Sequence, residues 1–137
     1  MTVRLPRDLR HVLECWARES YPQEACGVLI GRQTETEVAI DDVVHTRNLN
    51  TERARDRFEL DPEDLLRAGE RALGLGLDVV GIWHTHPDHP ARPSETDRAR
   101  AWEAWIYLIV PVQEGDVGEP RAWRLNGSGF VEKKLKS

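Results

Sequence analysis

The sequence has few of the features that mark secreted or membrane-spanning chains. Only two cysteines, Cys15 and Cys26, occur among 137 residues, which is too few for a disulfide framework, and we expect both to be reduced. The longest apolar runs, Ile106–Pro111 and Leu77–Trp83, are far shorter than the roughly 18 to 20 residues of a membrane span. The N-terminus carries charges where a signal peptide would have its apolar region. We therefore expect a cytoplasmic protein that does not contact a membrane.

Positive charge is also scarce relative to negative charge. The chain has 19 Lys and Arg against 24 Asp and Glu, a formal net charge of −5, and this balance argues against a nucleic-acid partner because phosphate binding needs a basic surface. Charged residues make up 31% and apolar residues 39%, which is typical of a folded globular chain and not of a disordered one. At this length, residues 1–137 are predicted to form one domain around one core.

Hydrophobic periodicity predicts three helices and several strands. Apolar positions from Leu9 to Ala17 recur with helical spacing, and Ser20-Tyr21-Pro22 ends that helix. Asp61-Pro62-Glu63-Asp64 predicts the start of a second helix that ends near Leu73. Strands are predicted at residues 25–31, 37–45, 57–60, 78–86 and 105–112, a third helix from 94 through 102, a loop at 114–120, and a terminal hairpin of 121–125 with 129–135. This order indicates an α/β (α+β) fold in which helices flank a central mixed β-sheet.

The segment His84-Thr85-His86 carries the most specific chemical signal, because it follows a strand that is predicted to be buried. The two-residue period of a strand puts His84 and His86 on one face, roughly 6.6 Å apart at about 3.3 Å rise per residue. Asp97 follows after a proline-rich loop, in the first turn of the predicted third helix. Catalytic zinc sites have three protein ligands and one water, and His84, His86 and Asp97 supply that number.

Hydrolysis at such an ion also needs a base that handles the proton of the attacking water. The candidates by position are Glu24, Glu59, Asp61, Asp88 and Glu95, and spacing alone does not rank them, although the first precedes a buried strand.

Ser94 is a candidate to hold a substrate oxygen while charge develops on it. The Ser-x-x-Asp spacing from Ser94 to Asp97 is equally a helix-capping pattern, and the two roles are compatible.

Three further side chains lie close in sequence to the candidate site. Cys26 is expected near Glu24 and is best interpreted as a small buried core residue, with a metal or redox role as the alternative. Asp88 and His89 are expected to be solvated loop residues, although either is a possible fourth ligand. Trp83 precedes His84 directly and is expected either in the core or as a wall of the site.

Together these residues resemble the JAMM or MPN+ metalloprotease family. Its pattern is a distant Glu, His-[Ser/Thr]-His, seven residues, Ser, two residues and Asp, which reads here as Glu24, His84-Thr85-His86, Ser94 and Asp97. The flanking segments Glu24–Leu29, Phe58–Pro62 and Val80–Trp83 also resemble the small stand-alone bacterial members. The resemblance covers roughly residues 5 to 112.

The resemblance implies a cytidine-deaminase-like JAMM/MPN fold in which His84, His86 and Asp97 bind zinc. Glu24 would act as general base and then acid, and Ser94 would assist the tetrahedral intermediate. The implied activity is a zinc-dependent peptidase or isopeptidase that hydrolyses the bond after the C-terminal Gly-Gly of a ubiquitin-like protein. It would remove either cysteine from a sulfur carrier or a small modifier from lysine. The alternatives are a non-catalytic module that binds a ubiquitin-like protein, and a hydrolase of small peptides or cell-wall fragments.

Overall fold

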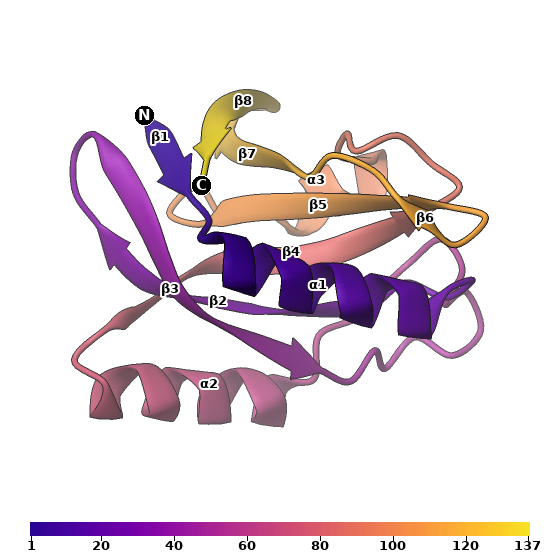
Figure 1. Cartoon of the computed structure of the whole chain (residues 1–137), viewed down its shortest axis with the longest axis horizontal. Coiled ribbons are helices and arrows are strands. Elements are labelled where there is room, and N and C mark those ends of the chain that lie inside the picture. The colour runs from indigo at the N-terminus through magenta and orange to yellow at the C-terminus, as the bar shows by residue number, and fades with distance from the viewer.

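The computed structural model describes residues 1–137, and its central feature is a mixed β-sheet that is flanked by helices, as predicted (Figure 1). The elements along the chain are β1 (Thr2–Arg4), α1 (Arg7–Ser20), β2 (Cys26–Gln33), β3 (Glu37–Thr46), α2 (Pro62–Gly74), β4 (Asp78–Pro87), α3 (Glu95–Arg100), β5 (Ile106–Gln113), β6 (Asp116–Val117), β7 (Arg121–Asn126) and β8 (Gly129–Lys136). No helix has the length and apolar character needed to cross a membrane.

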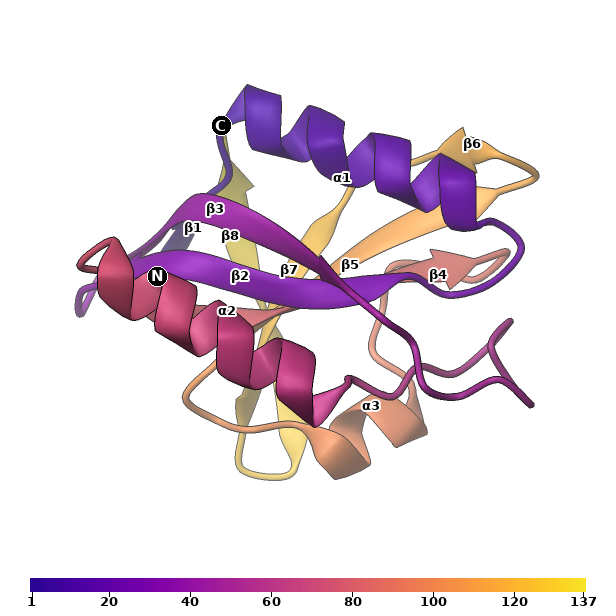
Figure 2. The ribbon, with the colours of Figure 1, turned by 90° about the horizontal axis from the view of Figure 1, so that it is seen from below.

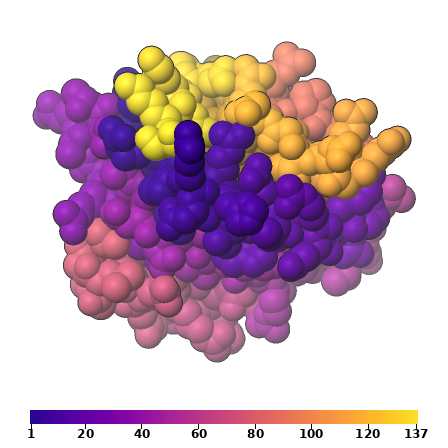
Figure 3. All heavy atoms as spheres, in the orientation of Figure 1, coloured from indigo at the N-terminus to yellow at the C-terminus, as the bar shows by residue number.

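The sheet closes on itself. Its strand order is β4-β2-β3-β1-β8-β7-β5-β6, and β4 also pairs with β5, so that every strand except β6 belongs to a ring. β1 joins the two halves of this ring, because it lies parallel to β3 on one side and to β8 on the other. The chain ends therefore lie side by side, as the space-filling view shows, and Arg4 donates a hydrogen bond to the carbonyl oxygen of Ser137 over 3.3 Å (Figure 3).

Helices α1 and α2 lie on opposite sides of the sheet (Figure 2). The apolar stripe of α1, which includes Leu13, packs on a core that contains Leu29, Trp83 and Leu108. The small residues Ala68 and Ala72 of α2 pack against the other face, on Val28, Ile30 and Ile82. Successive residues of β4 therefore face different layers, and both layers keep the strand out of water.

β4 holds the candidate site because it is paired along both edges. Cys26 of β2 lies opposite His84 in antiparallel register, and Ile109 of β5 lies opposite it in parallel register. Thr85 fixes the segment before β2, since its backbone N–H donates to the carbonyl of Ala25 and its Oγ1 accepts the N–H of Ala25, both over 2.9 Å. Glu24 is thereby held next to His84.

Two sequence predictions about local structure were wrong. Residues 57–60 do not form a strand, and only Leu60 makes an isolated bridge with Asn48. Backbone groups of this segment form hydrogen bonds with the side chain of Asn48 instead of with a strand. Asn48 accepts the N–H of Glu59 and donates to the carbonyl of Arg57. The third helix ends at Arg100 and does not reach Trp102, since Ala101 is extended and the Trp102 N–H donates to the Tyr107 hydroxyl.

Two short strands were not predicted, namely β1 and β6, which lies within the expected 114–120 loop. The predicted terminal hairpin is confirmed as β7 and β8, which pair from Ala122 opposite Lys133 to Asn126 opposite Gly129. The first two helices end within a residue of the predicted positions.

Gly81 is required where β4 meets β5. A Cβ atom at this position would lie 2.0 Å from the carbonyl oxygen of Ile106, its partner in the ladder. We expect Gly81→Ala to lower the free energy of unfolding by about 1 to 3 kcal/mol, because the strands must separate to admit the methyl group. Gly69→Ala in α2 is the matched control: no atom lies within 4 Å of its added Cβ, so it should raise stability by about 0.5 to 1 kcal/mol. Urea unfolding measures both changes, and equal stability of the two variants would contradict the close approach.

Candidate metal centre

Four side chains that are distant in the sequence converge at the end of β4. Glu24 precedes β2, His84 and His86 project from β4, and Asp97 lies in the first turn of α3. All four are almost completely removed from solvent. Asp97 Oδ2 lies 3.2 Å from His86 Nε2, Asp97 Oδ1 lies 3.7 Å from His84 Nε2, and Glu24 Oε1 lies 3.3 Å from His84 Nδ1.

The hydrogen bonds of His86 prepare it to bind a cation. Its Nδ1 lies 2.7 Å from the carbonyl oxygen of Pro90, so the proton of the neutral ring resides on Nδ1, as in metal-binding histidines. Its Nε2 then directs a lone pair toward Asp97. Burial alone lowers the pKa of His86, but the hydrogen bonds with Asp97 and Pro90 and the charges of Asp97 and Glu24 together raise the pKa above its usual value. The pair therefore requires a positive charge between its atoms, either a proton or a metal ion.

His84 and Glu24 have a similar requirement. Both ring nitrogens of His84 and Oε1 of Glu24 are buried without a hydrogen-bond partner, because their mutual contacts lack hydrogen-bond geometry. A buried polar atom without a partner costs about 1 to 3 kcal/mol. Glu24, His84 and His86 each offer a ligand atom within 4.8 Å of the others. A metal ion would satisfy these atoms, so the donor set fits a divalent cation.

A capping box at the start of α3 orients the carboxylate of Asp97. The Ser94 N–H donates to Asp97 Oδ2 over 2.8 Å, and Ser94 Oγ accepts the Asp97 N–H over 3.1 Å. Burial alone would raise the pKa of Asp97, but the hydrogen bonds with His86 and Ser94 and the charges of His84 and His86 together hold the pKa well below its usual range. Ser94 therefore caps α3, as the spacing predicted, and its O–H can still donate a hydrogen bond to another acceptor.

The other acidic candidates have different roles. Asp61 caps α2 by accepting the N–H of Glu63, Asp88 accepts the Tyr21 hydroxyl over 2.8 Å, and Glu95 pairs with Arg98 over 2.6 Å. Glu59 is exposed on the loop that follows Phe58. Only Glu24 is buried beside the histidines.

Trp83 does not wall the site. It stacks on Trp16 of α1 with ring centroids 5.6 Å apart and donates from Nε1 to the carbonyl of Val44 over 3.0 Å. The alternation that places His84 and His86 on one face turns Trp83 to the other. Phe58 lies beside the site instead, since its ring stacks on the ring of His84 with centroids 4.5 Å apart.

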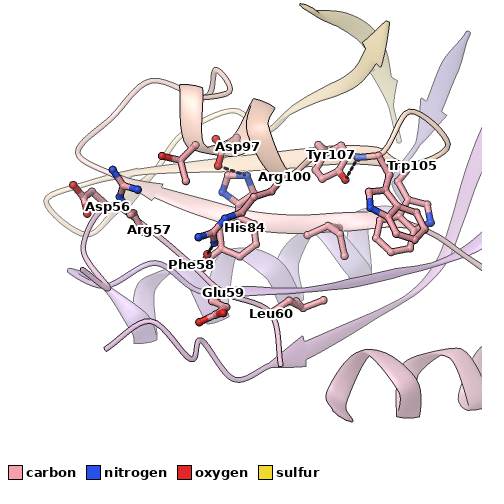
Figure 4. Close-up of a pocket in the computed structure, with 13 residues that line it drawn as sticks. Asp56, Arg57, Phe58, Glu59, Leu60, His84, Asp97, Arg100, Trp105 and Tyr107 are labelled. Atoms are coloured by element: carbon pink, nitrogen blue, oxygen red, sulfur yellow. Dashed lines mark hydrogen bonds and ion pairs between the residues drawn. The ribbon is translucent and has the colours of Figure 1, made fainter. Parts of the chain in front are cut away.

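A cavity of about 360 Å³ opens beside His84 and Asp97, and the sequence did not predict it (Figure 4). Its apolar lining comes from Phe58, Leu60, Ile82, Trp102, Trp105 and Tyr107. The rings of Trp102 and Trp105 stack with centroids 4.9 Å apart, and Trp102 is 63% exposed to solvent. In the sequence, the one feature that could have indicated this cavity is the pair of tryptophans three residues apart in the segment before β5.

Comparisons with known proteins agree with this geometry. Residues 6–126 match the family described as prokaryotic homologs of the JAB domain. The chain therefore belongs to the JAB domain family, as the JAMM/MPN+ resemblance implied.

Individual relatives cover most of the chain. A desampylase from Haloferax volcanii is 36% identical over 110 residues, which cover 77% of each chain. A CysO-cysteine peptidase from Mycobacterium tuberculosis is 28% identical over 129 residues, which cover 93% of this chain and 86% of the relative. A solved structure from Desulfitobacterium hafniense is 26% identical with a TM-score of 0.85, and the match covers 98% of this chain and 91% of that one.

Cys26 is a core residue, as predicted, although it lies close to the site. Its thiol is buried and donates to the carbonyl of Arg47, and it contacts Thr46 Oγ1 at 3.5 Å. Burial raises the pKa of Cys26 to about 11. A thiol with this pKa is protonated at neutral pH and is therefore unreactive.

We expect iodoacetamide at pH 7.5 to alkylate the partly exposed Cys15 and to leave Cys26 unmodified until the protein is unfolded in urea. Peptide mapping by mass spectrometry distinguishes the two sites. Modification of Cys26 in the folded protein at the rate of Cys15 would contradict the assigned burial.

Proposed function

We propose that this protein is a zinc-dependent peptidase that hydrolyses the amide bond after the C-terminal Gly-Gly of a ubiquitin-like protein. The observation that carries the proposal is the buried, unpartnered donor atoms of Glu24 and His84, which lie beside His86 and the carboxylate of Asp97. Two of the relatives, a desampylase and a CysO-cysteine peptidase, bear the names of such activities. We further propose that the protein acts in the cytoplasm.

His84, His86 and Asp97 are the proposed zinc ligands, in agreement with the family pattern. Nitrogen and oxygen ligands of this kind suit zinc, and the carbonyl of Pro90 supports the role of His86 by fixing its tautomer. When bound, zinc would polarise a substrate carbonyl and lower the pKa of a water molecule.

Glu24 is the proposed general base and acid. Its carboxylate is buried beside His84 and forms no hydrogen bond through Oε1, so it is available to take a proton from water and later deliver it to the leaving amine. A module that only bound a partner would not need this unpartnered acid, which favours an enzyme over the binding alternative. Ser94 would donate its uncommitted O–H to the substrate oxygen as negative charge develops there.

Zinc binding tests the ligand assignment. We expect one zinc per chain in the wild type and in Glu24→Gln, and loss of zinc in His86→Ala and Asp97→Asn. His89→Ala is the matched control for the histidines and should retain the metal. At a zinc concentration one hundred times Kd, the native state should gain about 2.7 kcal/mol. Plasma emission spectrometry with thermal unfolding measures both quantities, and zinc retained by Asp97→Asn but lost by Glu24→Gln would contradict the assignment.

Cleavage tests the activity itself. We expect the zinc-loaded protein to release cysteine from a ubiquitin-like sulfur carrier that ends in Gly-Gly-Cys, and a chelator to abolish the release. Glu24→Gln should lower kcat by about 10² to 10⁴-fold, because the amide cannot transfer the proton. Intact-mass spectrometry follows the product. Full activity of Glu24→Gln would exclude the proposed base, and no cleavage by the wild type would refute the proposed activity.

A further inference from the structure

Two openings of different chemistry flank the candidate metal centre. The apolar cavity described above is lined by His84 and Asp97, whereas a polar cleft of about 410 Å³ is lined by Glu24, His86 and Ser94. The two openings meet beside the centre, because both are lined by Asp56, Arg57 and Thr96. Figure 4 shows Arg57 at one end of the apolar cavity and Trp105 at the other, with His84 and Asp97 between them. A substrate that crosses the centre therefore passes from an aromatic end to a polar end.

The position of Glu24 sets the direction of the substrate. Glu24 lines the polar cleft and not the apolar cavity. The leaving amine must receive its proton from this carboxylate, so the leaving group occupies the polar cleft. The tail of the ubiquitin-like protein then lies in the apolar cavity, where its preceding residues meet the aromatic side chains.

The polar cleft contains two cations without anionic partners. Two of its three carboxylates pair with other arginines, Glu95 with Arg98 and Asp56 with Arg53, and the third, Glu24, faces His84. Arg57 and Arg92 form no ion pair, and Arg57 is only partly exposed. In a chain of net charge −5, two free guanidinium groups next to the site of proton delivery favour an anionic leaving group. Arginine binds carboxylates through paired, charge-assisted hydrogen bonds.

We propose that Arg57 and Arg92 bind the α-carboxylate of a single C-terminal residue, so that the enzyme prefers to release a terminal amino acid over a lysine side chain. This inference rests on the proposed function. In an isopeptide, the scissile nitrogen carries four methylene groups and no nearby carboxylate for the arginines, and Pro90 is the one apolar side chain that lines the polar cleft. Water adds its hydroxyl to the carbonyl carbon of the second glycine, the C–N bond breaks, and the released amino acid carries the proton from water on its nitrogen.

Three substrates that share one ubiquitin-like carrier test this preference. The first ends in Gly-Gly-Ala with a free carboxylate, the second is the same chain with a C-terminal carboxamide, and the third is joined through Gly-Gly to the ε-amine of Nα-acetyl-lysine amide. Alanine avoids thiol binding to the metal. We expect kcat/KM of the zinc-loaded wild type to be about tenfold or more higher for the free acid than for either other substrate, mostly through KM.

The double variant R57Q/R92Q should bring the ratio of kcat/KM for acid over carboxamide close to one. Arg55→Gln is the matched control, because Arg55 is exposed in the same loop and lines neither opening, and it should keep the wild-type ratio. A wild-type ratio near one, a faster reaction of the isopeptide, or an unchanged ratio in the double variant would each overturn the proposal while leaving the proposed function intact. Cleavage of none of the three would refute both.

Discussion

Pairing of β4 along both edges is the constraint on which the rest of the structure depends. β2 and β5 satisfy the backbone of this strand on its two sides, and helices α1 and α2 lie over the two faces of the sheet. A strand that is buried in this way usually carries apolar side chains throughout. Here it carries His84 and His86, whose side chains are almost completely removed from solvent. Two carboxylates approach these rings: Glu24 lies near one nitrogen of His84, and Asp97 lies near the other and near His86.

The candidate site combines carboxylate oxygens and imidazole nitrogens, and several of these atoms have no hydrogen-bond partner within the protein. Ser94 orients Asp97 through a hydrogen bond to its carboxylate, and Pro90 orients His86 through a hydrogen bond to its ring. The orientation of both side chains is therefore set by hydrogen bonds within the protein. Ser94 and Glu24 retain hydrogen-bonding capacity that is not used within the protein, and for this reason we propose them for the chemical step.

Much of the site was predictable because it depends on local spacing. The two-residue period of a strand places His84 and His86 together, and Ser94-x-x-Asp97 is a capping box in the structure. The same alternation turns Trp83 away from the site, which confirms the expectation of a core residue over the alternative of a wall of the site. The stacking of Phe58 on His84 and the cavity with Trp102 and Trp105 arise between segments that are distant in the sequence, and no periodicity encodes them. β1 was missed because three residues are too few to show a pattern.

The parallel pairing of β1 with β8 has a consequence for folding. Thr2 aligns with Lys134, so the ring of strands cannot close until residues 134–136 have left the ribosome. Contacts of such long sequence separation form slowly, and the partly built sheet meanwhile exposes unpaired strand edges. All four residues of the candidate metal centre precede β7 and β8 in the chain, so they are synthesised before the strands that close the ring.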